Sequence, residues 1–130
     1  MNELGFRINL KMSHQAAIEK VTAALKTEGF GVLTSIDAQE TMKQKLNVDF
    51  RPYTILGACN PPLAHQALTA NPEIGLLLPC NVIVYQEGEG TVVQIIDPQS
   101  MTQFFHDPEI ESVAAQARTR LLRVVETLRK

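Results

Sequence analysis

The residues of this chain best suited to chemistry are its two cysteines and the asparagine that follows each of them. Cys59-Asn60 and Cys80-Asn81 repeat one dipeptide in a chain of 130 residues that holds two cysteines. Asn60-Pro61 resembles a helix start, where unpaired backbone N–H groups and the helix dipole favour an anion. The pattern therefore predicts a stabilised thiolate with a lowered pKa at Cys59, and Cys80 as its partner thiol.

Other interpretations of these thiols stay open. Unpaired cysteines are usually buried core residues, which is the simplest reading of each one alone. Twenty residues separate the pair, which matches neither a Cys-x-x-Cys redox loop nor a zinc ribbon. His65, in the helix predicted between the cysteines, is a candidate third ligand for Zn²⁺, although a solvated surface histidine explains it equally well. The sequence identifies neither a specific metal nor a cofactor.

The two asparagines also have ordinary explanations, because Asn60 can cap the helix and Asn81 can bond a neighbouring turn. Their amides can equally bind a polar ligand. The predicted ligand-binding set is Cys59, Asn60, His65, Cys80 and Asn81. Further polar side chains can line a pocket, but no spacing links them: Arg51, Tyr53, Tyr85 and His106.

Length and composition predict a single domain over residues 1–130 with a self-sufficient core. The net charge of −2 argues against nucleic-acid or anionic-membrane partners, which require surplus Lys and Arg. The N-terminus lacks the basic and apolar regions of a secretory signal, and the longest apolar run is too short to span a bilayer. We expect a cytoplasmic protein, in which free thiols are more common than a disulfide.

The surrounding elements predict an α+β fold. Apolar alternation and β-branched runs predict five strands, at residues 4–10, 31–36, 50–58, 80–87 and 91–96. Pro52 implies that the third strand begins after it or lies at an edge there. Capping residues predict helices that begin after Ser13, Asp37, Asn60, Asp97 and Asp107. We expect a mainly antiparallel sheet of about five strands, with helices on one face and a terminal helix whose apolar stripe needs the sheet or a partner subunit to cover it.

Two segments resemble a known family. Leu-Gly-Ala-Cys-Asn-Pro-Pro-Leu-Ala at 56–64 and Pro-Glu-Ile-Gly-Leu-Leu-Leu-Pro-Cys-Asn-Val-Ile-Val-Tyr at 72–85 are similar to the signature of the prokaryotic domain of unknown function 302. The resemblance covers nearly the whole chain. It implies a small α+β domain with a curved antiparallel sheet, resembling half of the TATA-binding-protein fold, and a homodimer. It implies neither a reaction nor DNA binding. The family motifs mark Cys59, Asn60, Pro61, Pro79, Cys80 and Asn81 as site candidates.

Three functions fit these observations. The first is a homodimeric module that binds a small molecule in a pocket floored by the sheet and rimmed by the five predicted residues. The second is a thiol-based redox or metal-dependent enzyme or sensor, with Cys59 reactive and Cys80 resolving. The third is a purely structural homodimer whose terminal helix packs against its twin.

Overall fold

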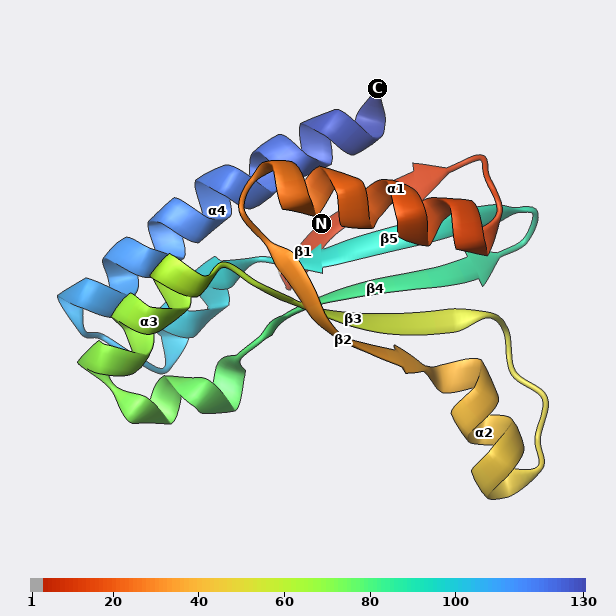
Figure 1. The fold of residues 1–130 in the computed structure, drawn as a ribbon, viewed down its shortest axis with the longest axis horizontal. Helices are drawn as coiled ribbons and strands as arrows, with labels where there is room; N and C mark the ends of the chain where they lie inside the picture. The colour runs from red at the N-terminus through yellow and green to blue at the C-terminus, as the bar shows by residue number, and fades with distance from the viewer. Residues whose placement is uncertain (1–3) are drawn as a thin grey trace.

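Five antiparallel strands form a single sheet (Figure 1). They are β1 (Gly5–Leu10), β2 (Gly31–Asp37), β3 (Tyr53–Cys59), β4 (Cys80–Glu87) and β5 (Gly90–Ile96). The computed structural model describes residues 4–130. The spatial order is β1-β5-β4-β3-β2, so the first two strands of the chain form the two edges and β3 lies inside the sheet, beginning directly after Pro52. The predicted α+β class and five-stranded antiparallel sheet are confirmed.

The helices begin at the capping residues that the sequence indicates. They are α1 (His14–Thr27), α2 (Ala38–Leu46), α3 (Pro61–Ala70) and α4 (Pro108–Arg129), with 3₁₀ helices η1 (Pro72–Leu77) and η2 (Pro98–Gln103). Ser13 Oγ accepts a hydrogen bond from the Ala16 N–H at 3.1 Å, and Asp37 Oδ1 accepts one from the Glu40 N–H at 2.9 Å. These bonds satisfy donors that the first helical turn leaves unpaired. Asp97 starts a 3₁₀ helix, η2. None of the helices within residues 4–130 is long and apolar enough to cross a membrane.

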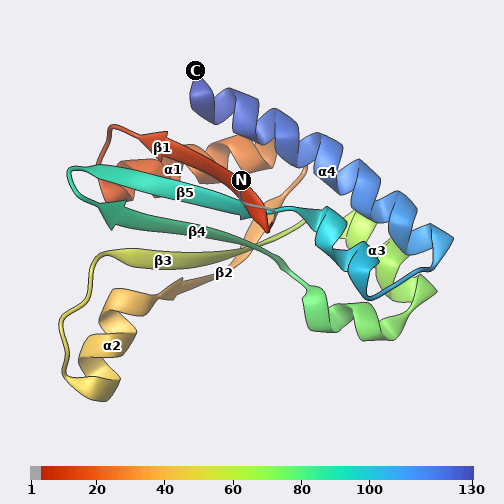
Figure 2. The same ribbon diagram turned by 180° about the vertical axis from the view of Figure 1, so that it is seen from behind.

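One face of the sheet carries the helix layer. Strand residues that point toward this layer, such as Ile8, Val84 and Val93, are buried with the apolar faces of α1 and α4. The apolar stripe of α4 is covered within its own chain, since Ile110 and Leu121 are fully buried there. The terminal helix therefore does not need a twin to cover its stripe, because its own chain covers it. The opposite face of the sheet faces the viewer in Figure 2, with no helix in front of it.

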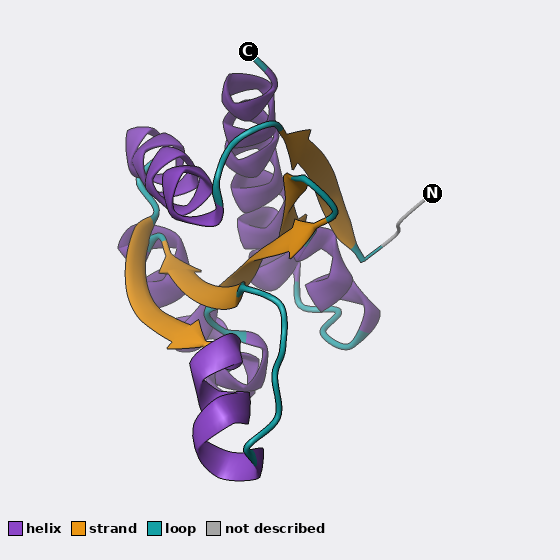
Figure 3. Ribbon diagram, turned by 90° about the vertical axis from the view of Figure 1, so that its right-hand side faces the viewer, coloured by secondary structure: helices purple, strands orange, loops and turns teal. Residues whose placement is uncertain are grey.

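The β2 edge is less well packed than the rest of the molecule. A register shift between Val32 and Thr34 interrupts its pairing with β3. Helix α2 follows β2 directly and extends away from the helix layer (Figure 3). None of the residues of α2 is buried. This corner exposes several apolar side chains: Leu33, Ile36, Leu46, Val48 and Phe50.

Candidate functional site

Both thiols lie at one end of the sheet, where β3 ends, β4 begins and α3 starts. Cys80 pairs across the strands with Ala58, the residue before Cys59. Cys59, Asn60 and Cys80 line the same small cavity, whose other walls are apolar residues, half of them from α3 and α4. Its volume is about 30 Å³, which is room for about one or two water molecules. Both cysteines thus border one cavity, which has little space for a ligand.

The electrostatics of the thiols differ from the sequence prediction. Burial raises the pKa of the Cys59 thiol, so the predicted lowering of its pKa by the helix start is wrong. Burial, and secondarily the nearby Cys59, raise the pKa of Cys80 to about 11. Asn60 Oδ1 itself accepts the Leu63 N–H, at 3.2 Å, so this donor of the helix start is not free to bond Cys59. Both groups are therefore thiols near neutral pH, and a thiol is a weak nucleophile and a poor metal ligand.

Asn60 connects two helices. It is 8% exposed. Its Oδ1 caps α3 at Leu63, and its Nδ2 donates to the Glu28 carbonyl oxygen at the end of α1, at 3.4 Å. Both ends of the amide are thus used inside the fold, which matches the capping role that the sequence indicates. This asparagine is accounted for by architecture.

His65 and Asn81 lie apart from the thiols. His65 is exposed on α3 and does not line the cavity. Asn81 points to the opposite side of the sheet from Cys80, because successive residues of a strand alternate between faces. Within residues 4–130, no group of three or more His, Cys, Asp or Glu side chains is placed to hold a metal ion. The single rim expected from the sequence is therefore divided between two faces of the molecule.

Asn81 belongs to the open face, which is the side of the sheet away from α1 and α4. There it lines a hollow of about 200 Å³ together with Gly5, Ile83, Gln94 and Ile96. The register of the strands places further apolar side chains on this face, among them Ile36, Ile55, Ile83 and Ile96. Ile36 is 50% exposed. Such a surface can bind apolar groups.

The sequence did not link the aromatic residues of the open face. Tyr53 and Tyr85 are direct partners across β3 and β4, and their rings stack with centroids 5.3 Å apart. Gln94 Nε2 donates to the Tyr85 hydroxyl oxygen at 2.9 Å, and the Arg51 guanidinium lies 5.8 Å from the Tyr85 ring centroid. Only the register of β3 against β4 could have revealed this cluster.

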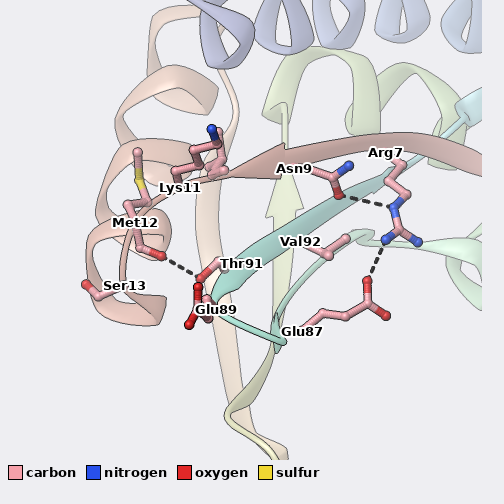
Figure 4. A pocket seen from close by; sticks show the side chains of 11 residues that line it. Arg7, Asn9, Lys11, Met12, Ser13, Glu87, Glu89, Thr91 and Val92 are labelled. Atoms are coloured by element: carbon pink, nitrogen blue, oxygen red, sulfur yellow. Dashed lines mark hydrogen bonds and ion pairs between the residues drawn. The ribbon is translucent and has the colours of Figure 1, made fainter.

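Another hollow, of about 780 Å³, lies at the β4–β5 turn (Figure 4). Arg7 and Glu87 line it side by side and form an ion pair of 2.6 Å. Thr91 Oγ1 donates to the Met12 carbonyl oxygen at 2.8 Å. Arg7, Glu87 and Thr91 therefore already have partners within the protein.

The family model described as "Domain of unknown function DUF302" matches residues 6–128. The chain belongs to the DUF302 family. Among solved structures, it is similar to an uncharacterized conserved protein DUF302 from Bacillus stearothermophilus, with 30% sequence identity and a TM-score of 0.88. The match covers 98% of this chain and 99% of that chain. No curated protein matches the chain.

Membership of DUF302 confirms the resemblance seen in the sequence and gives the fold, but it brings no reaction. The function of this DUF302 protein must therefore be argued from its own surfaces. Ligand binding by the five predicted residues stays a prediction. Cys59, Asn60 and Cys80 line the small cavity, whereas His65 and Asn81 lie elsewhere.

Proposed function

We propose that this DUF302 protein is a homodimeric interaction module in which two copies meet through the open face of the sheet. The observation that supports this is the apolar, uncovered character of that face, with Ile36, Ile55, Ile83 and the stacked Tyr53 and Tyr85 at its surface. Contiguous apolar surface of this kind is uncommon on monomeric proteins and usually marks an interface. The family resemblance implies a homodimer as well.

A second copy suits this face because one of its arginines is paired with a carboxylate and the other lies over an aromatic ring. Arg7 pairs with Glu87, and Arg51 lies over the Tyr85 ring. A two-fold interface places the same patch on both sides, so unpaired charges of one sign would repel each other. The strip between these residues carries isoleucine, tyrosine and amide side chains. Two copies can therefore approach through this uncharged strip without opposing charges.

The thiol-based alternative is less well supported. A reactive thiol needs a lowered pKa and access to substrate. Cys80 is buried with a pKa raised to about 11, and Cys59 has a raised pKa too. The cavity that the thiols share is too small for a substrate.

A small-molecule ligand is the second candidate, and its best location is the hollow at Asn81. The amides of Asn81 and Gln94 border apolar walls from Ile83 and Ile96, which is the usual composition of a small-ligand site. A fragment screen by NMR should then shift the Asn81 side-chain amide. Fragments that shift only residues outside this hollow would contradict the ligand site.

The dimer is tested by the molar mass in solution, measured by light scattering during size-exclusion chromatography. Wild type should elute at twice the 14.4 kDa of one chain. Ile83→Glu should weaken association on the order of a hundredfold, because it buries an unpaired carboxylate on both sides of the axis. Leu76→Glu is the matched control, since Leu76 is 84% exposed on η1, outside the sheet. A monomeric wild type, or a folded Ile83→Glu protein that stays dimeric, would contradict the proposal.

A further inference from the structure

The two edges of the sheet differ in their suitability for pairing. Strand β2 carries a register shift, and such bulges are a common way to protect an edge from further strands. Strand β1 pairs with β5 without interruption from Gly5 to Leu10. Its outer side has no neighbouring strand among the described residues. The regular edge of this sheet is therefore β1.

The backbone groups on that edge can be identified from the ladder. The Asp97 N–H donates to the Leu4 carbonyl oxygen at 2.9 Å, next to the first pair of β1 and β5. Antiparallel pairs alternate between bonded and non-bonded, so the N–H and C=O groups of Gly5, Arg7 and Asn9 point away from β5. These three residues offer donors and acceptors to an added strand.

A basic groove runs along this edge. It has a volume of about 540 Å³ and lies between β1, α1 and the end of α4. Five of the ten described residues that line it are lysine or arginine, and none is aspartate or glutamate: Arg7, Lys11, Lys20, Arg129 and Lys130. Lys20 Nζ donates to the Leu128 carbonyl oxygen at 3.3 Å, and Arg7 is paired with Glu87. Lys11, Arg129 and Lys130 are exposed.

One alternative explanation is that lysine on an edge strand simply repels other strands. Here, however, the cations come from three separate segments of the chain and converge on one groove. Cations on the edge strand alone would be enough to repel another strand. A second copy paired at β1 would place the same cations opposite one another, which disfavours it. An acidic segment would bring compensating charge.

We propose that the β1 edge binds an extended acidic peptide segment, which adds to the sheet as a sixth strand. The backbone of Gly5, Arg7 and Asn9 would pair with the peptide, and Lys11, Arg129 and Lys130 would attract its carboxylates. Main-chain pairing supplies affinity in such strand additions, and the side chains supply selectivity. A strand of this length accommodates a peptide of about six residues, or roughly 20 Å. The strand pairing uses the backbone of β1 with Lys11, Arg129 and Lys130, whereas the dimer uses the isoleucine and tyrosine side chains of the open face, so each proposal can fail without the other.

The test uses the full chain and a fluorescein-labelled peptide of eight residues that alternates glutamate with valine. Fluorescence anisotropy should show binding at low salt that weakens as salt increases. The same peptide with lysine in place of glutamate should not bind. An acidic peptide with alternate backbone nitrogens methylated should bind at least about tenfold more weakly, because it has lost the donors for the edge.

Charge-reversed proteins provide the matched comparison. Lys11→Glu with Arg129→Glu should weaken binding by about tenfold or more. Lys26→Glu with Lys45→Glu changes the net charge equally but away from the groove, and should bind like wild type. Circular dichroism confirms that both variants are folded before they are compared.

Amide hydrogen exchange identifies the bound edge. On addition of the acidic peptide, exchange at the Arg7 and Asn9 N–H groups should become slower. Equal binding of acidic and basic peptides, or binding without protection of Arg7 and Asn9, would overturn the proposal. Slower exchange of these amides at higher protein concentration, without peptide, would also overturn the proposal, because a second copy would then occupy the edge.

Discussion

Tyr53 and Tyr85 stack across β3 and β4, with ring centroids 5.3 Å apart and ring planes 11° from parallel. The neighbouring pair explains this contact. The Gln86 N–H donates to the Pro52 carbonyl oxygen at 3.0 Å, so the tyrosines occupy a non-hydrogen-bonded position of the ladder. Side chains approach most closely at such positions. The strand register thereby builds an aromatic pair on the open face of the sheet.

Gly57 is expected to be intolerant of any side chain. It pairs with Asn81, and a Cβ atom there would overlap Thr34 Oγ1 and lie 2.7 Å from Pro79 Cγ. We expect Gly57→Ala to lower the free energy of unfolding by about 1–3 kcal/mol, as overpacking generally does. Gly31→Ala is the control, because a Cβ there has no neighbour within 4 Å. Urea unfolding measures both, and equal stability of the two variants would contradict the steric explanation.

His14 should make stability depend on pH. Its Nε2 lies 2.8 Å from Thr54 Oγ1, and its Nδ1 is buried with no partner within the described part of the chain. Burial lowers the pKa of His14, an effect that Asp37 partly opposes. The unfolded chain therefore binds a proton more readily than the folded one, so the free energy of unfolding should fall as pH decreases below about 6.5.

Urea unfolding between about pH 8 and about pH 5 tests the role of His14. The decrease in the free energy of unfolding on acidification should be smaller in His14→Gln than in wild type. His65→Gln, which removes an exposed histidine, is the control and should behave like wild type. If His14→Gln and wild type lose the same free energy over this range, the buried imidazole is not responsible.

The thiols should differ in their rates of alkylation. Burial raises the pKa of Cys80 to about 11, and the side chain is 6% exposed, whereas Cys59 is partly exposed. At about pH 8 the thiolate fraction of Cys80 should be on the order of a hundredfold lower than that of an ordinary cysteine. Mass spectrometry after timed exposure to iodoacetamide should show Cys59 modified first and Cys80 modified only after unfolding in urea. Equal rates in the native protein would contradict the assigned burial.

Local patterns predicted much of the fold. The caps at Ser13, Asp37 and Asn60 and the turn before Gly90 depend on neighbouring residues, which a sequence displays directly. The family resemblance was likewise visible in the segments around the Cys-Asn pairs and is confirmed.

The site was harder to predict because it depends on contacts between distant segments. Alternation along β4 places Asn81 and Cys80 on opposite faces, which separates residues that are adjacent in sequence. The direction of the Cys59 pKa shift depends on burial, which the predicted helix start did not show. The Tyr53–Tyr85 pair depends on the register between two strands, which no local spacing reveals.

The most direct test of the open-face dimer is an isotope-filtered NOE experiment on mixed dimers, in which one copy carries ¹³C-labelled isoleucine methyl groups and the other is unlabelled. The proposed interface predicts intermolecular NOEs from the methyl groups of Ile55 and Ile83 to the tyrosine rings of the unlabelled copy. Absence of these NOEs, or intermolecular NOEs confined to isoleucines outside the open face such as Ile18 of α1, would contradict the proposal that two copies meet through this face.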